Sequence, residues 1–264
     1  MLAVVDWHVV WVRPFQPDHV FLRALWTTAY IAVTAQLLGV VLGLIAALMR
    51  MSKLAPLRWL SGLYVLIFRG TPLLVQIFFI YYGVDLLFGF GVIPTTLNFA
   101  VFRLDGAVFA GILALGLNEG AYMREIIRAG IDAIDKGQME AGRSLGMTHG
   151  RAMRRIVLPQ AARVIVPPLG NEFNGMLKNT SLVFTIGVYE MFADAEIHYS
   201  VNFQPVEFFG AVAVWYLLLT TVWTVIQTQI EKKLAVSERA EELSFRERVV
   251  DAWTPVQAWA RGAR

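Results

Sequence analysis

Polar side chains whose types could do chemistry interrupt long apolar stretches of this 264-residue chain. They are Asn118, Glu119, Lys178, Thr180 and Ser181. A charge near the centre of a bilayer costs at least ~2.5 kcal/mol on insertion scales, so such a group faces a cavity, a counter-charge or the protein interior. Glu119 can attract the ammonium group of a solute, and Lys178 can attract a carboxylate. Alternatively, Glu119 pairs structurally with Lys178 or Arg69, and both interpretations are open from the sequence.

Other kinds of site are not predicted. The chain has no cysteine, and its four histidines are scattered without the spacing of metal ligands. It carries neither a P-loop for ATP nor a recognisable pair of nucleophile and base. The sequence therefore predicts binding and passage of a solute, with no catalytic residue, metal or cofactor on this chain.

The composition is that of a membrane protein. Hydrophobic residues make up 57% of the chain and charged residues 16%, with a mean hydropathy of +0.56, whereas soluble domains are close to a quarter charged. The N-terminus lacks a basic segment before its apolar part, and no small-residue cleavage site follows, so we expect no removable signal peptide. The net charge of +3 would suit nucleic acid or anionic lipid, and the positions of the charges decide between them.

Five segments are expected to cross a bilayer, which takes roughly 20 helical residues. They are residues 20–49, 59–90, 106–123, 164–192 and 208–230. The first contains Gly39 and Gly43, a pair of small residues that favours close contact with another helix. The fourth contains Pro167–Pro168 and several polar side chains, so it must be interrupted or packed inside protein.

The basic residues orient these segments. Three Lys and Arg side chains lie between the first and second segments and eight between the third and fourth, but one between the second and third and none between the fourth and fifth. By the positive-inside rule the N-terminus is outside and the C-terminus inside. We therefore expect an extracytoplasmic segment 1–19, a transmembrane domain 20–230 with a cytoplasmic loop 124–163, and a cytoplasmic tail 231–264 that is partly an amphipathic helix. Membrane lipid, and not nucleic acid, is the partner that such basic loops favour.

The cytoplasmic loop carries the sequence EAGRSLGMTHGRAMRRIVLP at residues 140–159. Good helix formers at 138–145, a glycine at 146 in the C′ position and Thr148 as a cap predict a short helix, a turn and a second helix that runs through Arg155. The alternative is a basic amphipathic loop whose arginines face anionic lipid.

This loop resembles the EAA loop of ATP-binding cassette (ABC) importer permeases, in which a short helix inserts into a groove of the ATPase subunit. Gly142 stands where that family usually has a second alanine, and we expect small side chains there to let the helix backbone approach its partner closely. The resemblance implies that the ATPase-docking residues are Glu140, Ala141, Gly142, Leu145, Gly146, Ile156, Leu158 and Pro159.

Four further stretches, at residues 69–83, 115–131, 159–173 and 177–190, are similar to the polar amino acid permeases of the same superfamily. That group handles histidine, glutamine, glutamate, arginine, opines and related solutes, and the likeness covers about residues 20–230. Glu119 departs from it, because a small or polar residue is more usual there. The resemblance implies an all-α integral membrane fold with five transmembrane helices, like that of type I ABC importers, with cytoplasmic coupling helices.

The resemblance also implies partners in a prokaryotic inner membrane. The chain would be a permease subunit that pairs with a second, identical or homologous permease. ABC ATPase subunits, which bind ATP, would dock from the cytoplasm, and an extracytoplasmic solute-binding protein would deliver a polar amino acid or an opine- or ectoine-like solute. The rival interpretation is an autonomous secondary transporter or channel that uses Glu119 and Lys178.

The second apolar segment contains a predicted helix start, with Thr71 as N-cap and Pro72 as the first helical residue. If the segment breaks at Gly70, a helix N-terminus within the membrane region favours an anionic group such as a solute carboxylate. Alternatively, residues 59–68 form an interfacial helix and Thr71 only starts the span. The candidates for the solute path are Thr71, Gln76, Asn118, Glu119, Lys178, Thr180 and Ser181.

Overall fold

The computed structural model describes residues 17–89, 91, 93–98 and 103–234. Most of the predicted extracytoplasmic segment 1–19 and of the predicted tail 231–264 lies outside the described residues. The chain divides into two compact units, Met1–Glu231 and Lys232–Arg264, and nearly all described elements belong to the first.

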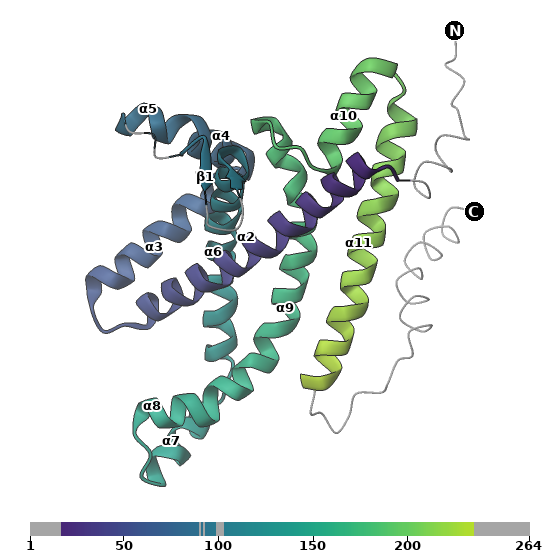
Figure 1. The fold of residues 1–264 in the computed structure, drawn as a ribbon. Coiled ribbons are helices and arrows are strands. Elements are labelled where there is room, and N and C mark those ends of the chain that lie inside the picture. Colours follow the sequence, from purple (N-terminus) through teal and green to yellow (C-terminus); the bar gives the residue numbers. More distant parts are fainter. Residues whose placement is uncertain (1–16, 90, 92, 99–102, 235–264) are drawn as a thin grey trace, which may run out of the picture. The chain divides into compact units, whose positions relative to one another are not determined.

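The described part of the chain is mostly helical, as predicted, and adds a short antiparallel hairpin that the sequence did not predict (Figure 1). The elements are α2 (His19–Met51), α3 (Ala55–Gly70), α4 (Leu73–Phe78), a π-helical stretch (Phe79–Gly83), α5 (Val84–Phe88), β1 (Thr96–Asn98), β2 (Arg103–Asp105), α6 (Gly106–Asp132), α7 (Lys136–Ser144), α8 (His149–Ala152), a second π-helical stretch (Met153–Val157), α9 (Leu158–Asn179), a 3-10 helix (Thr180–Ile186), α10 (Met191–Asn202) and α11 (Pro205–Leu234).

Three helices, α2, α6 and α11, are long and apolar enough to cross a membrane. The pair formed by α3 and the helical stretch from Leu73 to Phe88 meets the same condition but is bent by 108° at its break, so it gives a fourth span only if both arms are counted together. The predicted fourth segment corresponds to α9, which is not among the helices that meet the condition in the described part of the chain. The multi-helix apolar fold is confirmed, and the number of five spans stays a prediction.

Small residues let α2 and α6 approach closely over much of their lengths. A Cβ atom added to Gly39 of α2 would lie 2.5 Å from Cγ of Glu119, and one added to Gly116 of α6 would lie 2.6 Å from Cδ2 of Leu38. Gly43 is similarly crowded by Met123 of α6, and Gly120 by Leu42 of α2 and by the hydroxyl of Tyr64 of α3. The close contact predicted from Gly39 and Gly43 is therefore present, and glycines on both helices produce it.

The second apolar segment breaks where the sequence indicated, at Gly70, but the predicted cap is wrong. The new helix begins at Leu73, so Pro72 is its N-cap and no side chain caps it. Thr71 instead donates a hydrogen bond from Oγ1 to the carbonyl of Ile67, 2.8 Å away. The Thr71 hydroxyl therefore bonds to a carbonyl in the last turn of α3 and does not cap the N-terminus of α4. Carbonyls in the last turn of a helix lack a partner within the helix, and the Ile67 carbonyl is within reach of this hydroxyl.

The fourth segment is interrupted, although not at its prolines. Helix α9 continues through Pro167–Pro168, then tightens into the 3-10 helix and ends at a turn where Gly187 has φ +88°. Side chains of α11 bond to α9 carbonyls beside the prolines: Trp223 donates to Gly170 O over 2.7 Å and Gln227 donates to Pro167 O over 3.2 Å. These two hydrogen bonds join α11 to α9 near the prolines.

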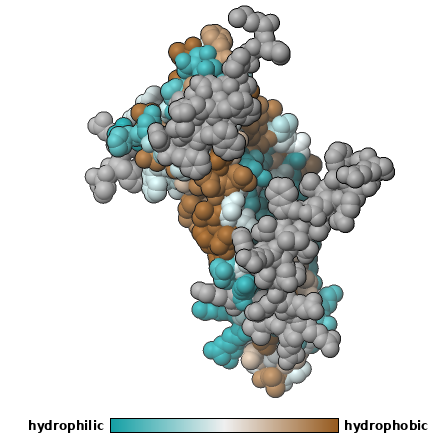
Figure 2. Space-filling model, turned by 90° about the vertical axis from the view of Figure 1, so that its right-hand side faces the viewer, coloured by the Kyte–Doolittle hydropathy of each residue, from teal (hydrophilic) through white to brown (hydrophobic). Residues whose placement is uncertain are grey.

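Apolar side chains are exposed along the outer faces of the long helices. They include Leu37, Val41, Leu44 and Leu48 on α2, and Leu217, Leu218, Val222 and Val225 on α11. Figure 2 shows a hydrophobic zone in the middle of one face, with more hydrophilic surface toward the lower end. Exposed apolar surface of this extent is typical of contact with lipid or with other membrane helices.

Candidate functional site

The break between α3 and α4 is held by a polar network that joins it to α6. Nε2 of Gln76 donates to the carbonyls of Phe68 and Thr71, at 2.9 and 3.0 Å, and to Oγ1 of Thr71 at 2.8 Å. Nδ2 of Asn118 donates to the same Phe68 carbonyl at 2.9 Å and to Oε1 of Gln76 at 3.0 Å. Three predicted path residues thus lie together, and they satisfy the backbone that the break exposes.

Glu119 lies at the contact between α2 and α6, where only 5% of it is exposed. Its Oε1 accepts a hydrogen bond of 2.9 Å from Nε2 of Gln36. The alternative in which Glu119 forms an ion pair with Lys178 or Arg69 is wrong, because neither ion pair is present among the described residues. The reason is the register of α2 against α6, which turns the Glu119 side chain toward Gly39 and Gln36.

The polar residues at the end of α9 do not cluster with Glu119. Lys178 is exposed, and the described residues offer it no ion pair. Thr180, which is fully buried, donates from Oγ1 to the Leu177 carbonyl at 2.8 Å, and Ser181 donates to the Lys178 carbonyl at 2.8 Å. The two hydroxyls therefore bond to carbonyls in the last turn of α9, where the helix changes to a 3-10 helix.

Two charged side chains that the prediction did not bring together, Arg69 and Glu172, influence each other electrostatically. The guanidinium of Arg69, at the exposed end of α3, lies 5.0 Å from the ring centroid of Tyr122 on α6. It also interacts electrostatically with the carboxylate of Glu172 on α9, which is half-buried, although the two groups form no ion pair. The signal in the sequence was a charge in each of two apolar segments, but the sequence does not show that these two charges influence each other.

Glu190 is a second residue that sequence reasoning missed. It is fully buried at the start of α10, where its Oε1 accepts from the backbone N–H of Ala193 at 2.8 Å. Its Oε2 accepts from Thr28 Oγ1 of α2 at 3.2 Å and from the hydroxyl of Tyr216 of α11 at 2.9 Å. One carboxylate thus caps α10 and joins it to two long helices.

The predicted docking element is a helix hairpin at one end of the molecule, formed by α7 and α8 (Figure 1). Helix α7 ends in a Schellman motif, in which Gly146 N–H donates to the Arg143 carbonyl and Met147 N–H to the Gly142 carbonyl. Gly146 has φ +81°, the left-handed conformation that favours glycine. Thr148 caps α8 through the N–H of Arg151, as predicted.

The side chains of this hairpin divide into an outer and an inner set. Glu140, Ala141 and Gly146 are exposed, and Leu145 is 80% exposed although it is apolar. Gly142 is buried instead, because it faces the second helix: an added Cβ atom would lie 2.8 Å from Cδ1 of Ile156. We expected Gly142 to bring the backbone close to a partner, but its small size serves the packing inside the hairpin.

The second helix of the hairpin does not end near Arg155, so that predicted boundary is wrong. It passes through the π-helical stretch Met153–Val157 directly into α9, with Pro159 in the first turn of α9. Proline lacks an N–H, and a π-helical stretch before it accommodates the lost hydrogen bond. The α7–α8 hairpin is therefore continuous with α9. Leu158 and Pro159 are exposed beside this junction.

No group of three or more His, Cys, Asp or Glu side chains that could hold a metal ion is found among the residues the structure describes.

Comparison with known proteins shows that most of this chain is similar to membrane components of transport systems. The sequence model of the binding-protein-dependent transport system inner membrane component matches residues 39–236. A probable amino-acid permease protein of Bacillus subtilis, YxeN, is 42% identical over 234 residues, which cover 89% of this chain and 98% of that protein. A probable amino-acid ABC transporter permease protein of Vibrio harveyi, PatM, is 44% identical over 215 residues, covering 81% and 92% of the two chains.

Solved structures show the same likeness. A crystal structure of an amino acid ABC transporter with histidines matches with a TM-score of 0.70 and 40% identity, covering 81% of this chain and 94% of that one. An inward-facing structure of the MetNI methionine ABC transporter matches with a TM-score of 0.67 over 82% of this chain and 96% of that one. At 16% identity this second likeness shows the fold alone.

Proposed function

Because this chain belongs to the family of binding-protein-dependent transport system inner membrane components, we propose that it lines the translocation path of an ATP-driven importer for a polar amino acid or a related solute. It is a multi-pass protein of the prokaryotic inner membrane and a transport subunit, not an enzyme. The identity of 42% to 44% with amino-acid permeases, extending over nearly the whole length of those proteins, is the observation that carries the proposal.

The assembly that we propose contains a second permease, identical or homologous, and two ABC ATPase subunits on the cytoplasmic side. ATP binds to those ATPase subunits, and an extracytoplasmic solute-binding protein delivers the solute. The permease has five spans, with its N-terminus outside, its loop 124–163 in the cytoplasm and its tail 231–264 inside. The distribution of Lys and Arg residues supports this orientation.

The exposed side of the α7–α8 hairpin is the proposed docking surface for the ATPase. Leu145 and Ala141 present apolar contact area there, and Glu140 offers a carboxylate to a basic or backbone donor. The rigid Schellman turn fixes the angle between the two helices, and the junction with α9 continues into the membrane domain. A movement of the ATPase would therefore be transmitted to α9 without an intervening flexible loop.

The solute region that we propose lies between the end of α3, the middle of α6 and α9. Arg69 and Glu172 have opposite charges and are not joined in an ion pair, which suits a zwitterion whose carboxylate meets the guanidinium and whose ammonium group meets the Glu172 carboxylate. Exposed Thr71, Lys178 and the half-buried Ser181 remain candidates for contact with solute. Gln76, Asn118, Glu119 and Thr180 shape the path by holding its helices in place.

The rival function, an autonomous secondary transporter or channel, relied on Glu119 and Lys178 acting together. Glu119 is buried against α2 and bonded to Gln36, whereas Lys178 is exposed and has no ion pair with it among the described residues. Nothing in this arrangement favours a relay between them.

Uptake into proteoliposomes tests the proposal. The chain is reconstituted with its ATPase subunits and its solute-binding protein, and labelled polar amino acids are supplied outside with ATP inside. We expect uptake that needs both ATP and the binding protein. Uptake that is driven by an ion gradient in the absence of ATP would contradict the proposal, whereas failure of one amino acid alone would only narrow the solute.

A further inference from the structure

The contact between α2 and α6 contains a buried hydrogen-bond acceptor that has no donor. Gln36 of α2 is 5% exposed, and its Nε2 donates to Oε1 of Glu119 on α6 at 2.9 Å. The Oε1 atom of Gln36 is buried and has no hydrogen-bond partner among the described residues. A buried carbonyl oxygen without a donor is costly, so this atom indicates a missing donor.

The carboxyl group of Glu119 presents the complementary problem. Glu119 is also 5% exposed, and no Lys, Arg or His among the described residues forms an ion pair with it. The Glu172 carboxylate of α9 does interact with it electrostatically, but that charge has the same sign. If Glu119 were ionised, the contact between α2 and α6 would bury a negative charge that no ion pair balances.

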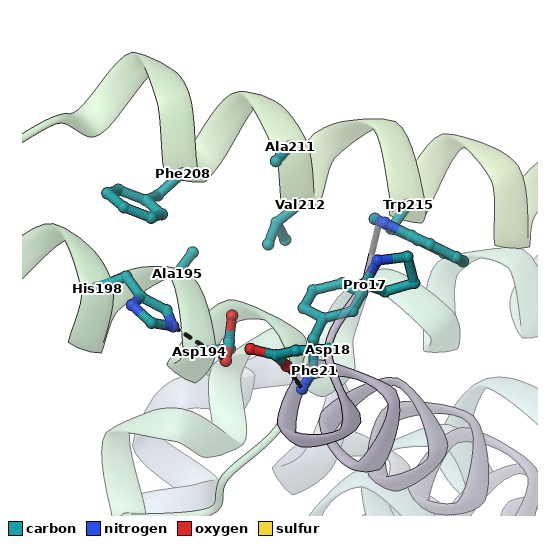
Figure 3. Close-up of a pocket in the computed structure, with 10 residues that line it drawn as sticks. All are labelled: Pro17, Asp18, Phe21, Asp194, Ala195, His198, Phe208, Ala211, Val212 and Trp215. Atoms are coloured by element: carbon teal, nitrogen blue, oxygen red, sulfur yellow. Dashed lines mark hydrogen bonds and ion pairs between the residues drawn. The ribbon is translucent and has the colours of Figure 1, made fainter. Parts of the chain in front are cut away.

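Another buried carboxylate of this chain has a different environment. Asp194 lines a cavity between α2, α10 and α11, where its Oδ1 lies 3.7 Å from Nε2 of His198 (Figure 3). The same oxygen accepts a hydrogen bond of 2.5 Å from the hydroxyl of Tyr189. Asp194 thus has a hydroxyl donor and an imidazole that can carry a positive charge, whereas Gln36 gives Glu119 an amide donor and no charge.

The hydroxyl of Tyr64 on α3 is not the missing donor. Tyr64 interacts electrostatically with Glu119, and a Cβ atom added to Gly120 would lie 2.4 Å from its hydroxyl oxygen. A phenol has a single hydrogen to donate, and Tyr64 donates it to the Leu117 carbonyl at 2.6 Å. A hydrogen atom carried by Glu119 itself is therefore the donor closest to Gln36.

We propose that Glu119 binds a proton at neutral pH and donates it, as a carboxylic acid, to Oε1 of Gln36. The acid and the amide then form a ring of two hydrogen bonds, in which Nε2 of Gln36 donates to one oxygen of Glu119 and the other oxygen donates back. One proton thus supplies the missing donor and removes the unbalanced charge. The helices pack closely here, since a Cβ atom added to Gly39 would lie 2.5 Å from Cγ of Glu119, and a proton needs no further space. The pair does not depend on the transport function proposed above.

Infrared spectroscopy detects this proton, because a carboxylic acid has a C=O stretching band that a carboxylate lacks. The full chain is measured at neutral pH in an ester-free detergent. We expect a carboxylic-acid band, sensitive to exchange into heavy water, that is present in the wild type and lost in Glu119→Gln. Glu190→Gln, which removes another buried carboxyl group, is the control and should retain this band. A wild-type spectrum without a band that depends on Glu119 would overturn the proposal.

Gln36→Leu tests whether the proton is donated to Gln36. This variant keeps Glu119 but removes its amide partner, so the carboxylic-acid band should move to the higher frequency of a more weakly hydrogen-bonded acid. A band at an unchanged frequency would show that the acid is bonded elsewhere and would contradict the proposed pair.

Equilibrium unfolding in mixed detergent micelles gives a second measurement. A glutamate in an unfolded chain ionises at about pH 4.3, so above that pH a native chain that keeps the Glu119 proton binds one proton more than the unfolded chain. The folded-to-unfolded ratio of the wild type, divided by that of Glu119→Gln, should therefore fall about tenfold for each unit of pH between about 5 and neutrality.

Glu119→Gln is the reference because its side-chain amide can replace the acid in both hydrogen bonds and has no proton to lose. It should fold as the wild type does at acidic pH. A divided ratio that stays constant or rises with pH would contradict the proposal, and so would failure of Glu119→Gln to fold.

Discussion

The side-chain amide of Asn118 donates a hydrogen bond to Oε1 of Gln76 over 3.0 Å, and this bond joins the middle of α6 to the start of α4. The same amide nitrogen bonds to the Phe68 carbonyl at the end of α3. The sharp bend of the second apolar segment is therefore fixed from α6, on the side where Arg69 meets Tyr122.

Asn118→Leu should lower the free energy of unfolding of the detergent-solubilised chain by about 1–3 kcal/mol, because it leaves the buried Gln76 oxygen without its donor. Thermal unfolding with and without the substitution measures this. Asn179→Leu is the control, since Asn179 is exposed and makes no side-chain hydrogen bond among the described residues. Equal stability of the two variants would show that the network does not hold the bend.

A comparison of two glycines tests the contact between α2 and α6. Gly39→Ala would place a methyl group 2.5 Å from Cγ of Glu119 and should destabilise the chain by about 1–3 kcal/mol through overpacking. Gly62→Ala on α3 meets nothing within 4 Å and should be neutral or slightly stabilising, because alanine favours a helix. The midpoint of thermal unfolding reports both, and a neutral Gly39→Ala would mean that the two helices separate easily.

Part of this architecture could be predicted because local rules decide it. Gly146 and Thr148 determine the docking hairpin through a C-cap and an N-cap, each of which depends on residues a few positions away. The break at Gly70 could be expected for the same reason, but Thr71 was assigned to the wrong helix end. A threonine hydroxyl can bond back to its own helix as easily as forward to the next one, and here it reaches Ile67 O.

The long-range partners could not be predicted, because they depend on how helices are set against one another. Glu119 bonds to Gln36, 83 residues earlier, and the register of α2 on α6 selects this amide over Lys178 or Arg69. Arg69 and Glu172 influence each other electrostatically in a fold in which α3 and α9 both pack against α6. A charge in an apolar segment indicates that a partner exists without indicating which one.

Glu172→Gln and Arg69→Gln should each raise the KM for amino acid uptake in proteoliposomes by about tenfold or more, since each removes a charged contact worth about 1.5–3 kcal/mol. Arg69→Lys keeps the charge and should recover part of the affinity. Arg58→Gln, at the other end of α3, controls for the loss of an arginine from the same helix. An unchanged KM in both charge-neutral variants would show that Arg69 and Glu172 do not contact the solute.

We propose that this permease couples to an ATPase through the exposed Leu145, and Leu145→Asp tests this coupling. Leu145 is 80% exposed on the docking hairpin, and Leu54, which is 63% exposed at the start of α3, provides the matched control Leu54→Asp. Co-purification with the ATPase subunits and ATP-dependent amino acid uptake are measured for both variants. We expect Leu145→Asp to fold normally but to lose both co-purification with the ATPase subunits and ATP-dependent uptake, whereas Leu54→Asp should keep both. Full ATPase assembly and ATP-coupled uptake in Leu145→Asp would contradict it.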